Sequence, residues 1–500
     1  MPPFDVGNGP GAVSKETILT AVSLASVGPF GDASVLEVAQ RIRRRETTAL
    51  EVTEQSLEAV NEYGTELNCF ITVDPEGARR AARDADRELA LGHDLGPLHG
   101  IPVGVKDLMA TSGLRTTMGS RHFAHHVPDA DADAVMLLRR SGAVILGKTH
   151  THEFAFGPTG DRAFTGPALN PLDTSRVTGG SSSGSAAAVA AGLVPIALGS
   201  DAAGSVRIPG ALCGVVGLRP TAGLVSVEGV FPLSHSLDVV SPLARAVSDT
   251  AVAWWALSTK STQEGIRRPI WSPSLLPEPG RAAQLRISEV KCDLTERVAS
   301  STQVEALQFA IETLTDSGAS MSETCIPEVD ECAQPHQNIL FAEAYAIHET
   351  RVKSAPELFD PEILNQLSVA SEVRGWEYVQ AQQTRARLRR QALERLSVVD
   401  VLILPTVPIE APLIGQRTLA DKAGWTTVRE ALKSFTVPWS LLDLPAISVP
   451  VLVHGAKMPG SVQLVGKPGE EQKLLDTAAA LEKAVTRLNA TSSPYVQRTL

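Results

Sequence analysis

The chain has 500 residues, of which 43% are apolar and 20% charged, and its formal net charge at pH 7 is -11. This composition is that of an ordinary folded protein and excludes a disordered chain, while the negative charge argues against a surface that neutralises nucleic-acid phosphates. The length alone suggests about three domains, although large α/β enzymes of this size often form one unit.

The five cysteines predict neither a disulfide framework nor a zinc site, because they are odd in number, scattered and without a CxxC pair. The N-terminal MPPFDVGNG lacks the basic start and apolar core of a signal peptide. The longest apolar stretch, 186–198, contains Pro195 and is too short to span a bilayer. We therefore expect a cytoplasmic protein with neither a nucleic-acid nor a membrane partner.

In chain order, apolar positions at helical spacing predict helices over about 34–90, before the first strand. Short apolar and helical runs then alternate: IPVGV at 101–105, a helix near 132–141, AVIL at 143–146, an alanine-rich helix, and LVPIAL at 193–198. Such alternation predicts an α/β layered fold with strands buried under helices.

The second half of the chain continues this pattern after a proline-rich segment over 263–280, which predicts a surface connector without strand or helix. Helices are expected over about 303–317 and 376–396, followed by buried strands at 401–405 and 446–453. We expect an N-terminal extension over 1–32 and a single domain over 33–490.

GAVILGKT at 142–149 matches the pattern GxxxxGK[ST] of a phosphate-binding loop only formally. In a true loop of this kind the four central residues form a turn whose N–H groups cradle phosphate, whereas Ala-Val-Ile-Leu favours a buried strand. We therefore expect a core strand that ends at Gly147 and no nucleotide site.

GSSSG at 180–184 places Ser182 in the GxSxG pattern of a nucleophile elbow. That elbow needs a strand directly before it, whereas the preceding NPLDTSRVTG is polar and contains a proline, which favours a loop. Two histidine-rich segments, HFAHH and HTHEF, could supply metal ligands, but neither contains HExxH, so packing or loop positions are favoured. These histidines are His122, His125, His126, His150 and His152.

A more specific signal comes from three segments taken together: GIPVGVKD with Lys106, GGSSSGSAAA from Gly179, and SDAAGSVRIPGALCGVVGLRPT from Ser200. In this order, with 24 residues between Ser181 and Ser205, they resemble the amidase signature family, the serine amidohydrolases with a Ser-cisSer-Lys triad. Further similar segments lie in order from about 95 to 466, including DVLILPTVPIEAP and FTVPWSLLDLPAISVPV. The resemblance implies a mixed, mostly parallel twisted sheet covered by helices on both faces.

Carried over by position, the resemblance implies that Ser205 is the acyl-forming nucleophile, Ser181 the bridging serine after a cis peptide bond from Gly180, and Lys106 the base. The backbone N–H groups of the nucleophile turn would line the oxyanion hole: Ala202, Ala203, Gly204 and Ser205. No metal or organic cofactor is required. Among their neighbours, Asp201 and Arg207 are expected to pair structurally, and Cys213 to be a buried small residue rather than a nucleophile.

The residues around Lys106 independently suit a base. Val103, Val105 and Leu108 predict that the lysine is buried, and desolvation disfavours its ammonium form and so lowers its pKa. A serine hydroxyl needs such a base within hydrogen-bond reach to attack a carbonyl carbon.

Five residues depart from the commonest pattern of the family. Ser183 and Ala203 stand where glycine is common, His150 and Ser440 where asparagine is common, and Asp443 replaces another glycine. None of these changes removes a reacting atom. They affect carried-over substrate contacts rather than the chemistry.

The resulting hypothesis is an amidase, a hydrolase of carbon–nitrogen bonds other than peptide bonds, that acts on a small or aryl amide or a carbamate through a serine acyl-enzyme. The alternative is the glutaminase-type subunit of a tRNA-dependent amidotransferase, which carries the same signature. Ala222 stands where that subunit commonly has tyrosine, and no counterpart of its SYYGGVRYG-like stretch is found. An inactive scaffold is disfavoured because all three triad residues are present. The expected partner is the small-molecule amide; a homodimer is considered but the oligomeric state is open.

Overall fold

A computed structural model describes residues 27–31, 33–258, 260–262, 265–267, 271–421 and 423–492. The expected N-terminal extension over 1–32 therefore lies almost wholly outside the described residues. Among the described helices, none is long and apolar enough to cross a membrane.

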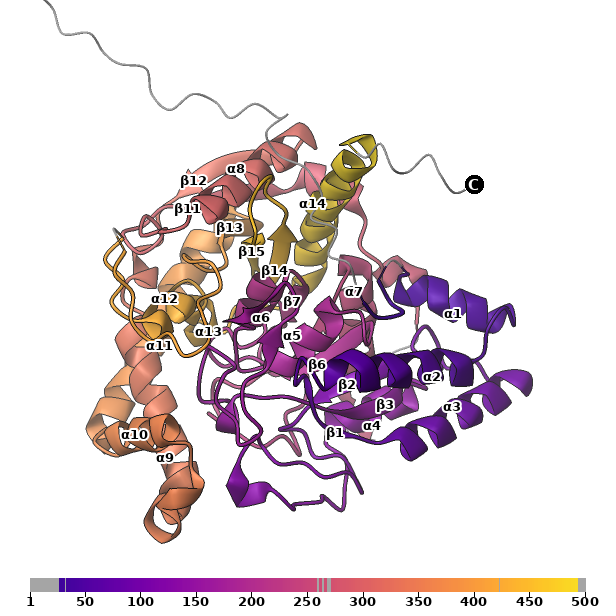
Figure 1. Ribbon diagram of the computed structural model, residues 1–500. Helices are drawn as coiled ribbons and strands as arrows, with labels where there is room; N and C mark the ends of the chain where they lie inside the picture. The colour runs from indigo at the N-terminus through magenta and orange to yellow at the C-terminus, as the bar shows by residue number, and fades with distance from the viewer. Residues whose placement is uncertain are drawn as a thin grey trace, which may run out of the picture.

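The architecture is organised around one 11-stranded sheet (Figure 1). From edge to edge its strands are β1 (Phe70–Val73), β3 (Val144–Thr149), β2 (Pro102–Lys106), β6 (Ile196–Ser200), β8 (Val240–Ala244), β7 (Val216–Arg219), β14 (Ala446–Val451), β15 (Gly460–Gly466), β13 (Val401–Pro405), β11 (Arg286–Val290) and β12 (Ser320–Thr324). The strands expected at 101–105, 143–146, 193–198, 401–405 and 446–453 are thus all present. Strand β3 continues to Thr149, so the expected end at Gly147 is two residues early.

The sheet is mixed, but the expectation that it is mostly parallel is wrong. Of its ten neighbouring pairs, six are antiparallel. Strand β8 inserts antiparallel between β6 and β7, and β14 and β15 form a hairpin. Strands buried on both faces are almost wholly apolar whichever way they run, so the sequence pattern does not report their direction.

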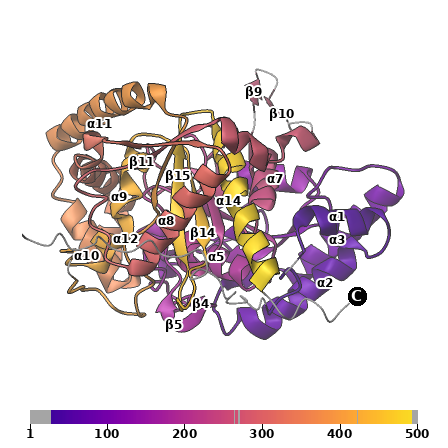
Figure 2. The same cartoon turned by 90° about the horizontal axis from the view of Figure 1, so that it is seen from above.

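Helices cover both faces of the sheet. Along β15, successive side chains point to opposite faces and pack against different helices. Val462 and Leu464 pack in one core cluster with α8 and α14, whereas Val465 packs in another with α6 and α9. Figure 2 shows α8 and α14 crossing the strands on one side. The helices are α1 (Val35–Arg43), α2 (Ala49–Ala59), α3 (Pro75–Ala90), α4 (Asp133–Arg140), α5 (Ser183–Ala190), α6 (Arg207–Cys213), α7 (Val247–Leu257), α8 (Ser301–Asp316), α9 (Ala333–Ser354), α10 (Pro361–Ala370), α11 (Gly375–Arg395), α12 (Val428–Ser434), α13 (Val437–Leu441) and α14 (Glu471–Ser492).

Two stretches differ from the sequence-based expectation. The helical region over 34–90 contains the short edge strand β1, which pairs antiparallel with β3. The connector over 263–280 was expected to lack strand and helix, yet Gly265–Arg267 pairs with Lys260–Thr262, and Pro273–Leu275 is a 3₁₀ turn. Strand β1 has four residues and the strand Gly265–Arg267 has three. Neither has enough alternating positions to show a strand period in the sequence.

Candidate active site

Lys106 is the last residue of β2, and its position follows from the parallel pairing of β3, β2 and β6. The carboxyl ends of parallel strands meet at one edge of a sheet, which brings Lys106 beside Ser200 at the end of β6. The lysine is fully buried. Its Nζ donates to Ser181 Oγ at 2.7 Å, Ser200 Oγ at 2.9 Å and Ser182 Oγ at 3.0 Å.

Burial lowers the pKa of Lys106 to about 7, and the charges of buried Asp238 and Asp201 only partly oppose this shift. Both protonation states are therefore populated near neutral pH. The three hydroxyl partners suit both states, because a hydroxyl can accept from an ammonium or donate to a neutral amine. The expectation of a buried lysine with a lowered pKa is confirmed. The sequence analysis did not identify Ser200 or Asp238 as neighbours of Lys106.

Ser181 follows a cis peptide bond from Gly180, as the resemblance implied. Its carbonyl accepts from the N–H of His152 at 3.1 Å, and the N–H of Gly180 donates to Pro158 at 2.7 Å. A Cβ at Gly180 would lie 2.7 Å from the nitrogen of Gly160, so only glycine fits this approach. Lys106 is the one described hydrogen-bond partner of the Ser181 hydroxyl, which leaves its proton free for transfer.

Ser182 is not free to act as a nucleophile. Its Oγ accepts from Lys106 and from the N–H of Ser200 at 3.2 Å, and it donates to the carbonyl of Ser200 at 3.3 Å. The segment before it is not simply a loop, since Leu169–Asn170 (β4) and Asp173–Val177 (β5) pair. That pair forms a separate two-stranded sheet, so it does not raise Ser182 above the central sheet as an elbow would require.

The nucleophile turn joins β6 to α6 and is held by a buried ion pair. Arg207 donates to both carboxylate oxygens of Asp201 at 3.0 Å, and the N–H groups of Gly204 and Val206 donate to the same carboxylate at 2.8 and 3.3 Å. Burial alone would raise the pKa of Asp201, but the charges of Arg207 and Arg219 outweigh it and hold the pKa well below its usual range. The expected structural pairing of Asp201 with Arg207 is confirmed.

The expectation that the N–H of Gly204 lines the oxyanion hole is corrected by this geometry. That N–H already donates a hydrogen bond to the carboxylate of Asp201. Gly204 instead provides the turn itself, with φ of +113°, and a Cβ there would meet Thr436 Oγ1 at 2.2 Å. The N–H groups of Ala202, Ala203 and Ser205 have no acceptor among the described residues. The hydroxyl of Ser205, whose residue is 8% exposed, likewise has no described hydrogen-bond partner.

Two residues far along the chain orient the peptide units of this turn. His336 Nε2 donates to the carbonyl of Ala202 at 3.0 Å, and Thr436 Oγ1 donates to the carbonyl of Ala203 at 2.7 Å. In a trans peptide the N–H points away from the carbonyl, so the Ala203 N–H faces away from His336. Burial lowers the pKa of His336 to about 3, which keeps the ring neutral. Neither residue was identified from the sequence.

Two of the departures from the family pattern meet in space. Ser183 Oγ lies 2.8 Å from His150 Nδ1, while His150 Nε2 donates to the carbonyl of Gly166 at 2.8 Å. Since a carbonyl only accepts, Nδ1 is the acceptor and Ser183 donates to it. Burial lowers the pKa of His150 to about 4, consistent with a neutral ring. The pair supports the segment that carries Ser181 and does not reach the reacting atoms.

The other departures also have structural partners. Ser440 Oγ accepts from Arg207 at 2.7 Å, so it belongs to the support of the nucleophile turn. Asp443 has φ of +54°, the left-handed region in which glycine is favoured, and its carboxylate accepts from Arg385 at 2.7 Å. Ala203 is not among the residues with positive φ, so alanine is accommodated there.

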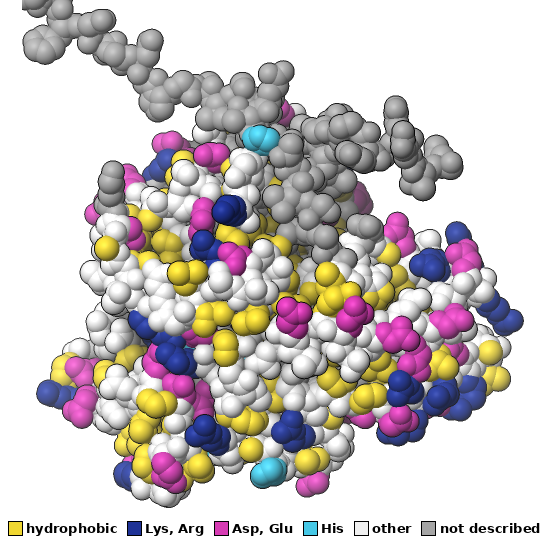
Figure 3. All heavy atoms as spheres, viewed as in Figure 1, with side chains coloured by type: hydrophobic (Ala, Val, Ile, Leu, Met, Phe, Trp, Pro, Cys, Tyr) yellow, Lys and Arg dark blue, Asp and Glu magenta, His cyan; other side chains and the backbone are white. Residues whose placement is uncertain are grey.

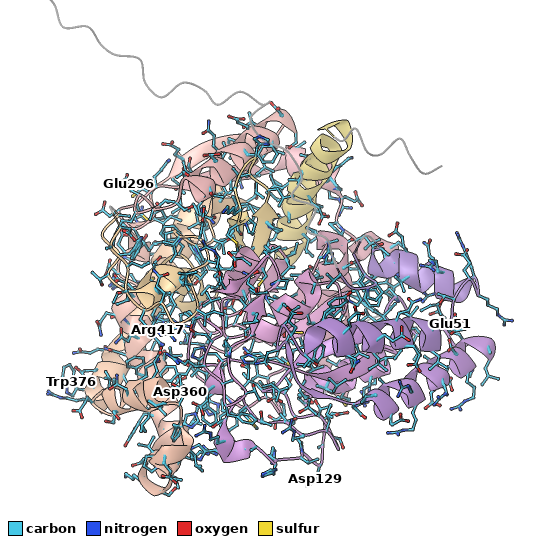
Figure 4. The ribbon with its side chains drawn as sticks, viewed as in Figure 1. Glu51, Asp129, Glu296, Asp360, Trp376 and Arg417 are labelled. Carbon is cyan, nitrogen blue, oxygen red and sulfur yellow. The ribbon has the colours of Figure 1, made fainter. Side chains whose placement is uncertain are left out.

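An ion-pair network ties the loop beside Ser181 to α10. Arg417 donates to Asp161 at 2.9 Å and to Glu362 at 2.8 Å, and the N–H of Asp360 donates to Glu153 at 2.8 Å. Figure 4 labels Arg417 and Asp360 where helices α9 to α11 meet the rest of the molecule. Burial opposes ionisation of Asp161, but the hydrogen bonds from Arg417 and Thr159 and the nearby positive charges together outweigh it and lower the pKa of Asp161 to about 2.

Of the two histidine-rich segments, HTHEF is buried, whereas His125 and His126 of HFAHH are exposed. His152 is buried and its Nδ1 accepts from the N–H of Gly160 at 3.2 Å. Within the described residues, no three His, Cys, Asp or Glu side chains gather as a metal ion would require. Cys213 is buried and burial raises the pKa of its thiol, as expected for a packing residue.

Lys148 of the GKT segment is a second fully buried lysine with a structural role. Its Nζ donates to the carbonyl of Met109 and, at 2.7 Å, to Thr111 Oγ1. Burial raises the pKa of nearby Asp107 to about 6, with the charge of Lys148 opposing the shift.

Lys148→Met should lower the free energy of unfolding by about 3 kcal/mol, because Asp107 would be left buried without its countercharge. The folded variant should retain any activity that depends on Ser181 and Ser205, since Lys148 has no described hydrogen bond to either serine. Urea unfolding followed by circular dichroism, with kinetics on the folded protein, measures both quantities. Unchanged stability, or loss of turnover in the folded variant, would contradict this assignment.

The sequence profile of the family described as Amidase matches residues 51–475. The chain belongs to the amidase family. It is therefore a hydrolase that acts on carbon–nitrogen bonds, and its 11-stranded sheet has the fold of the solved amidases.

Individual relatives of this amidase have varied functions. The chain is 34% identical over 480 residues to a subunit of the glutamyl-tRNA(Gln) amidotransferase of Geobacter sp. (strain M21), covering 90% of this chain and 97% of the relative. A structure described as "Crystal structure of amidase" superposes with a TM-score of 0.81 at 33% identity, covering 91% of this chain and 100% of the other. A chain from "An unexpected vestigial protein complex reveals the evolutionary origins of an s-triazine catabolic enzyme" has a TM-score of 0.84 at 32% identity, covering 90% and 98%.

Proposed function

We propose that this amidase cleaves the C–N bond of a small or aryl amide, or of a carbamate, through an acyl-enzyme on Ser205. The observation that carries the proposal is the fully buried Lys106, whose pKa is about 7 and whose Nζ lies 2.7 Å from Ser181 Oγ. A lysine in this state accepts a proton at neutral pH, which a serine hydroxyl requires for attack.

In the proposed first half-reaction, Lys106 takes the hydroxyl proton of Ser181 while Ser181 takes that of Ser205. Ser205 Oγ attacks the amide carbonyl carbon, and the resulting oxyanion accepts from free N–H groups of the nucleophile turn, such as those of Ala203 and Ser205. Ser181 then protonates the leaving nitrogen and recovers a proton from Lys106. The C–N bond breaks, the amine departs and the acyl group remains as an ester on Ser205.

Water completes the cycle by the same relay. It gives a proton towards Lys106 through Ser181 and attacks the ester carbonyl. The second tetrahedral intermediate collapses with return of the proton to Ser205 Oγ and releases a carboxylic acid, which loses its proton to solvent and becomes the carboxylate. All proton transfers are made by residues of this chain, and no cofactor takes part in any proposed step.

The glutaminase-type subunit of a tRNA-dependent amidotransferase is the second candidate, because the Geobacter relative carries the name of such a subunit. Ala222, where that subunit commonly has tyrosine, and the lack of its SYYGGVRYG-like stretch favour a free-standing amidase instead. The two candidates share the acyl-enzyme chemistry and differ in whether other subunits are needed.

The purified chain alone should therefore release ammonia or an amine from some simple amides with saturable kinetics. A screen of amides, anilides, esters and carbamates with mass detection of both products checks this. Turnover that appears only after partner subunits and charged tRNA are added would favour the amidotransferase function instead.

The remaining expectations from the sequence are kept as proposals: one domain over 33–490, a cytoplasmic location, and neither a nucleic-acid nor a membrane partner. The formal net charge of -11 supports the absence of a nucleic-acid partner. On the one face that Figure 3 shows, Lys and Arg side chains are interspersed with Asp and Glu rather than gathered in a basic stripe.

A further inference from the structure

Lys106 has no charged group in direct contact. Its Nζ is surrounded by the hydroxyls of Ser181, Ser182 and Ser200, and no described carboxylate forms an ion pair with it. When the lysine takes the proton of Ser181 in the proposed reaction, an ammonium charge forms on a fully buried side chain. A buried charge without a countercharge is costly. The proposed reaction therefore needs a negative charge close to the lysine.

Two carboxylates act on Lys106 through their charges, and Asp238 has a larger effect than Asp201. The carboxylate of Asp201 is already engaged by two guanidinium groups. Arg207 donates to both of its oxygens at 3.0 Å, and Arg219 lies 3.6 Å from it. Asp238 forms no ion pair with any described residue, so its charge is not neutralised at close range.

The position of Asp238 follows from the antiparallel pairing of β6 and β8. Ser200 pairs with Val240, the first residue of β8, and the N–H of Asp201 donates to the carbonyl of Val239 at 2.8 Å. Asp238 therefore lies directly before the strand that borders β6, at the edge of the sheet that carries the base. The strand pairing brings a carboxylate from far along the chain to this edge.

One oxygen of the Asp238 carboxylate is fixed and the other is free. Oδ2 accepts from the N–H groups of Leu233 and Ser234 at 2.8 and 3.0 Å, whereas Oδ1 has no hydrogen-bond partner among the described residues. Glu343 of α9 holds the same loop, because its carboxylate accepts from the Ser234 hydroxyl at 2.5 Å and from the N–H of Ser236 at 3.0 Å. Backbone contacts thus orient the Asp238 carboxylate without cancelling its charge.

The groups around Asp238 allow it to be ionised when Lys106 is protonated. Burial raises the pKa of Asp238 to about 6, and the charge of Glu343 adds to the shift. The hydrogen bonds from Ser234 and Leu233 and the charge of Lys106 oppose it. Near neutral pH the carboxylate is therefore largely ionised.

Two arginines approach the same part of the fold, but each contacts another carboxylate. Arg219 of β7 lies 3.6 Å from Asp201, and Arg385 of α11 lies 2.7 Å from Asp443. Of the cations, the base has the largest effect on the pKa of Asp238. The base and this carboxylate thus act chiefly on each other.

We propose that Asp238 is a positioning residue of the proton relay, whose carboxylate supplies the countercharge for the ammonium form of Lys106. This inference rests on the proposed function of Lys106 as the base. The proton passes from Ser181 to the lysine and back, while Asp238 stays ionised throughout. A negative charge fixed where positive charge develops lowers the barrier, because it needs no reorganisation during the reaction.

The kinetic test is Asp238→Asn, which removes the charge and keeps an oxygen that can accept from Leu233 and Ser234. Since the negative charge raises the pKa of Lys106, its loss should move the acidic limb of kcat/KM about one pH unit lower, the effect of one charge at an effective dielectric constant of about 20. The plateau should fall by about tenfold. Asp238→Glu, which retains the charge, should restore most of both changes.

The matched control is Asp249→Asn. Asp249 is buried, its pKa is raised by burial to about 7, and it accepts from the N–H of Val35 at 3.0 Å. Its charge is not among those that act on the pKa of Lys106, so this variant should keep the wild-type limb. An unchanged limb in Asp238→Asn, or an equal displacement in Asp249→Asn, would overturn the inference.

A titration without substrate separates this inference from the amidase proposal. In protein labelled with ¹³C at the lysine ε-carbons, the resonance missing from Lys106→Met belongs to Lys106, and its chemical shift reports protonation of the amine. Its pKa should be about 7 in the wild type and about one pH unit lower in Asp238→Asn. This result without hydrolysis of any amide would support the role of Asp238 and overturn the proposed function. Hydrolysis with an unchanged lysine pKa would overturn the inference alone.

The wild-type protein provides a further measurement that does not depend on the folding of a variant. Because the two groups interact, the Lys106 resonance should show a second, smaller inflection near pH 6, where Asp238 ionises. A single inflection would overturn the inference.

Discussion

Ser205→Ala should reduce kcat by roughly 10⁵- to 10⁶-fold, the loss typical of removing a serine nucleophile. The change removes one oxygen atom that has no described hydrogen-bond partner, so the fold and the ion pair of Asp201 with Arg207 should be unaffected. Steady-state kinetics on an amide substrate, with a thermal melt of the same preparation, separates loss of chemistry from loss of structure. The variant should also fail to react with a fluorophosphonate probe.

The matched control is Ser182→Ala, which removes a neighbouring serine hydroxyl from the same site. This hydroxyl is saturated by Lys106 and Ser200, so its loss should cost about 1 kcal/mol of stability and leave covalent labelling intact. Labelling retained in Ser205→Ala but lost in Ser182→Ala would instead favour the nucleophile-elbow interpretation of GSSSG.

Lys106→Met should lower kcat/KM by about 10²- to 10⁴-fold, the usual contribution of a positioned general base. Methionine has a similar volume and carries no charge, so the variant avoids burying an ammonium and should fold. Kinetics together with urea unfolding measures the two effects. Wild-type rates in this variant would remove the lysine from the mechanism.

The pH profile provides a second test of Lys106. Only the neutral amine accepts a proton, so kcat/KM should fall as pH drops below a pKa of about 7 and level off above it. In Lys106→Met this acidic limb should disappear, whereas Lys148→Met should keep it. An identical limb in Lys106→Met would assign the titration to another group.

The groups proposed to react could be found from the sequence because they lie in short, specific segments. The strand around Lys106 has apolar neighbours that predict burial, and burial is the physical cause of its lowered pKa. The resemblance placed Ser181 and Ser205, and the structure brings Ser181 to 2.7 Å from the lysine. The pairing of Asp201 with Arg207 was also predicted, since the two residues flank the nucleophile turn.

The groups that orient the turn could not be found in this way. His336 and Thr436 reach Ala202 and Ala203 from more than 100 residues along the chain, and no local pattern marks them. The N–H of Gly204 was misassigned because its direction depends on the carboxylate of Asp201, a side-chain placement that a motif does not encode. Strand direction was missed for a similar reason: β8 inserts between β6 and β7, and an apolar run is the same in either orientation.

The departures from the family pattern gave a signal that could have been used. Ser183 and His150 are both unusual for their positions, and they contact each other at 2.8 Å. Two polar residues that replace common ones within the same motif set are candidates for a contact, because each supplies the partner that the other requires when buried. A paired substitution of this kind would have predicted proximity of the two segments.

The measurement that tests the account most directly is mapping of the acyl group during turnover of an aryl amide. The reaction is stopped with acid within the first turnovers, the protein is digested, and the peptides are sequenced by mass spectrometry. The account predicts the acyl group of the substrate as an ester on Ser205, absent from Ser205→Ala. An acyl group on Ser181, Ser182 or Cys213, or turnover without any acylated residue, would contradict it.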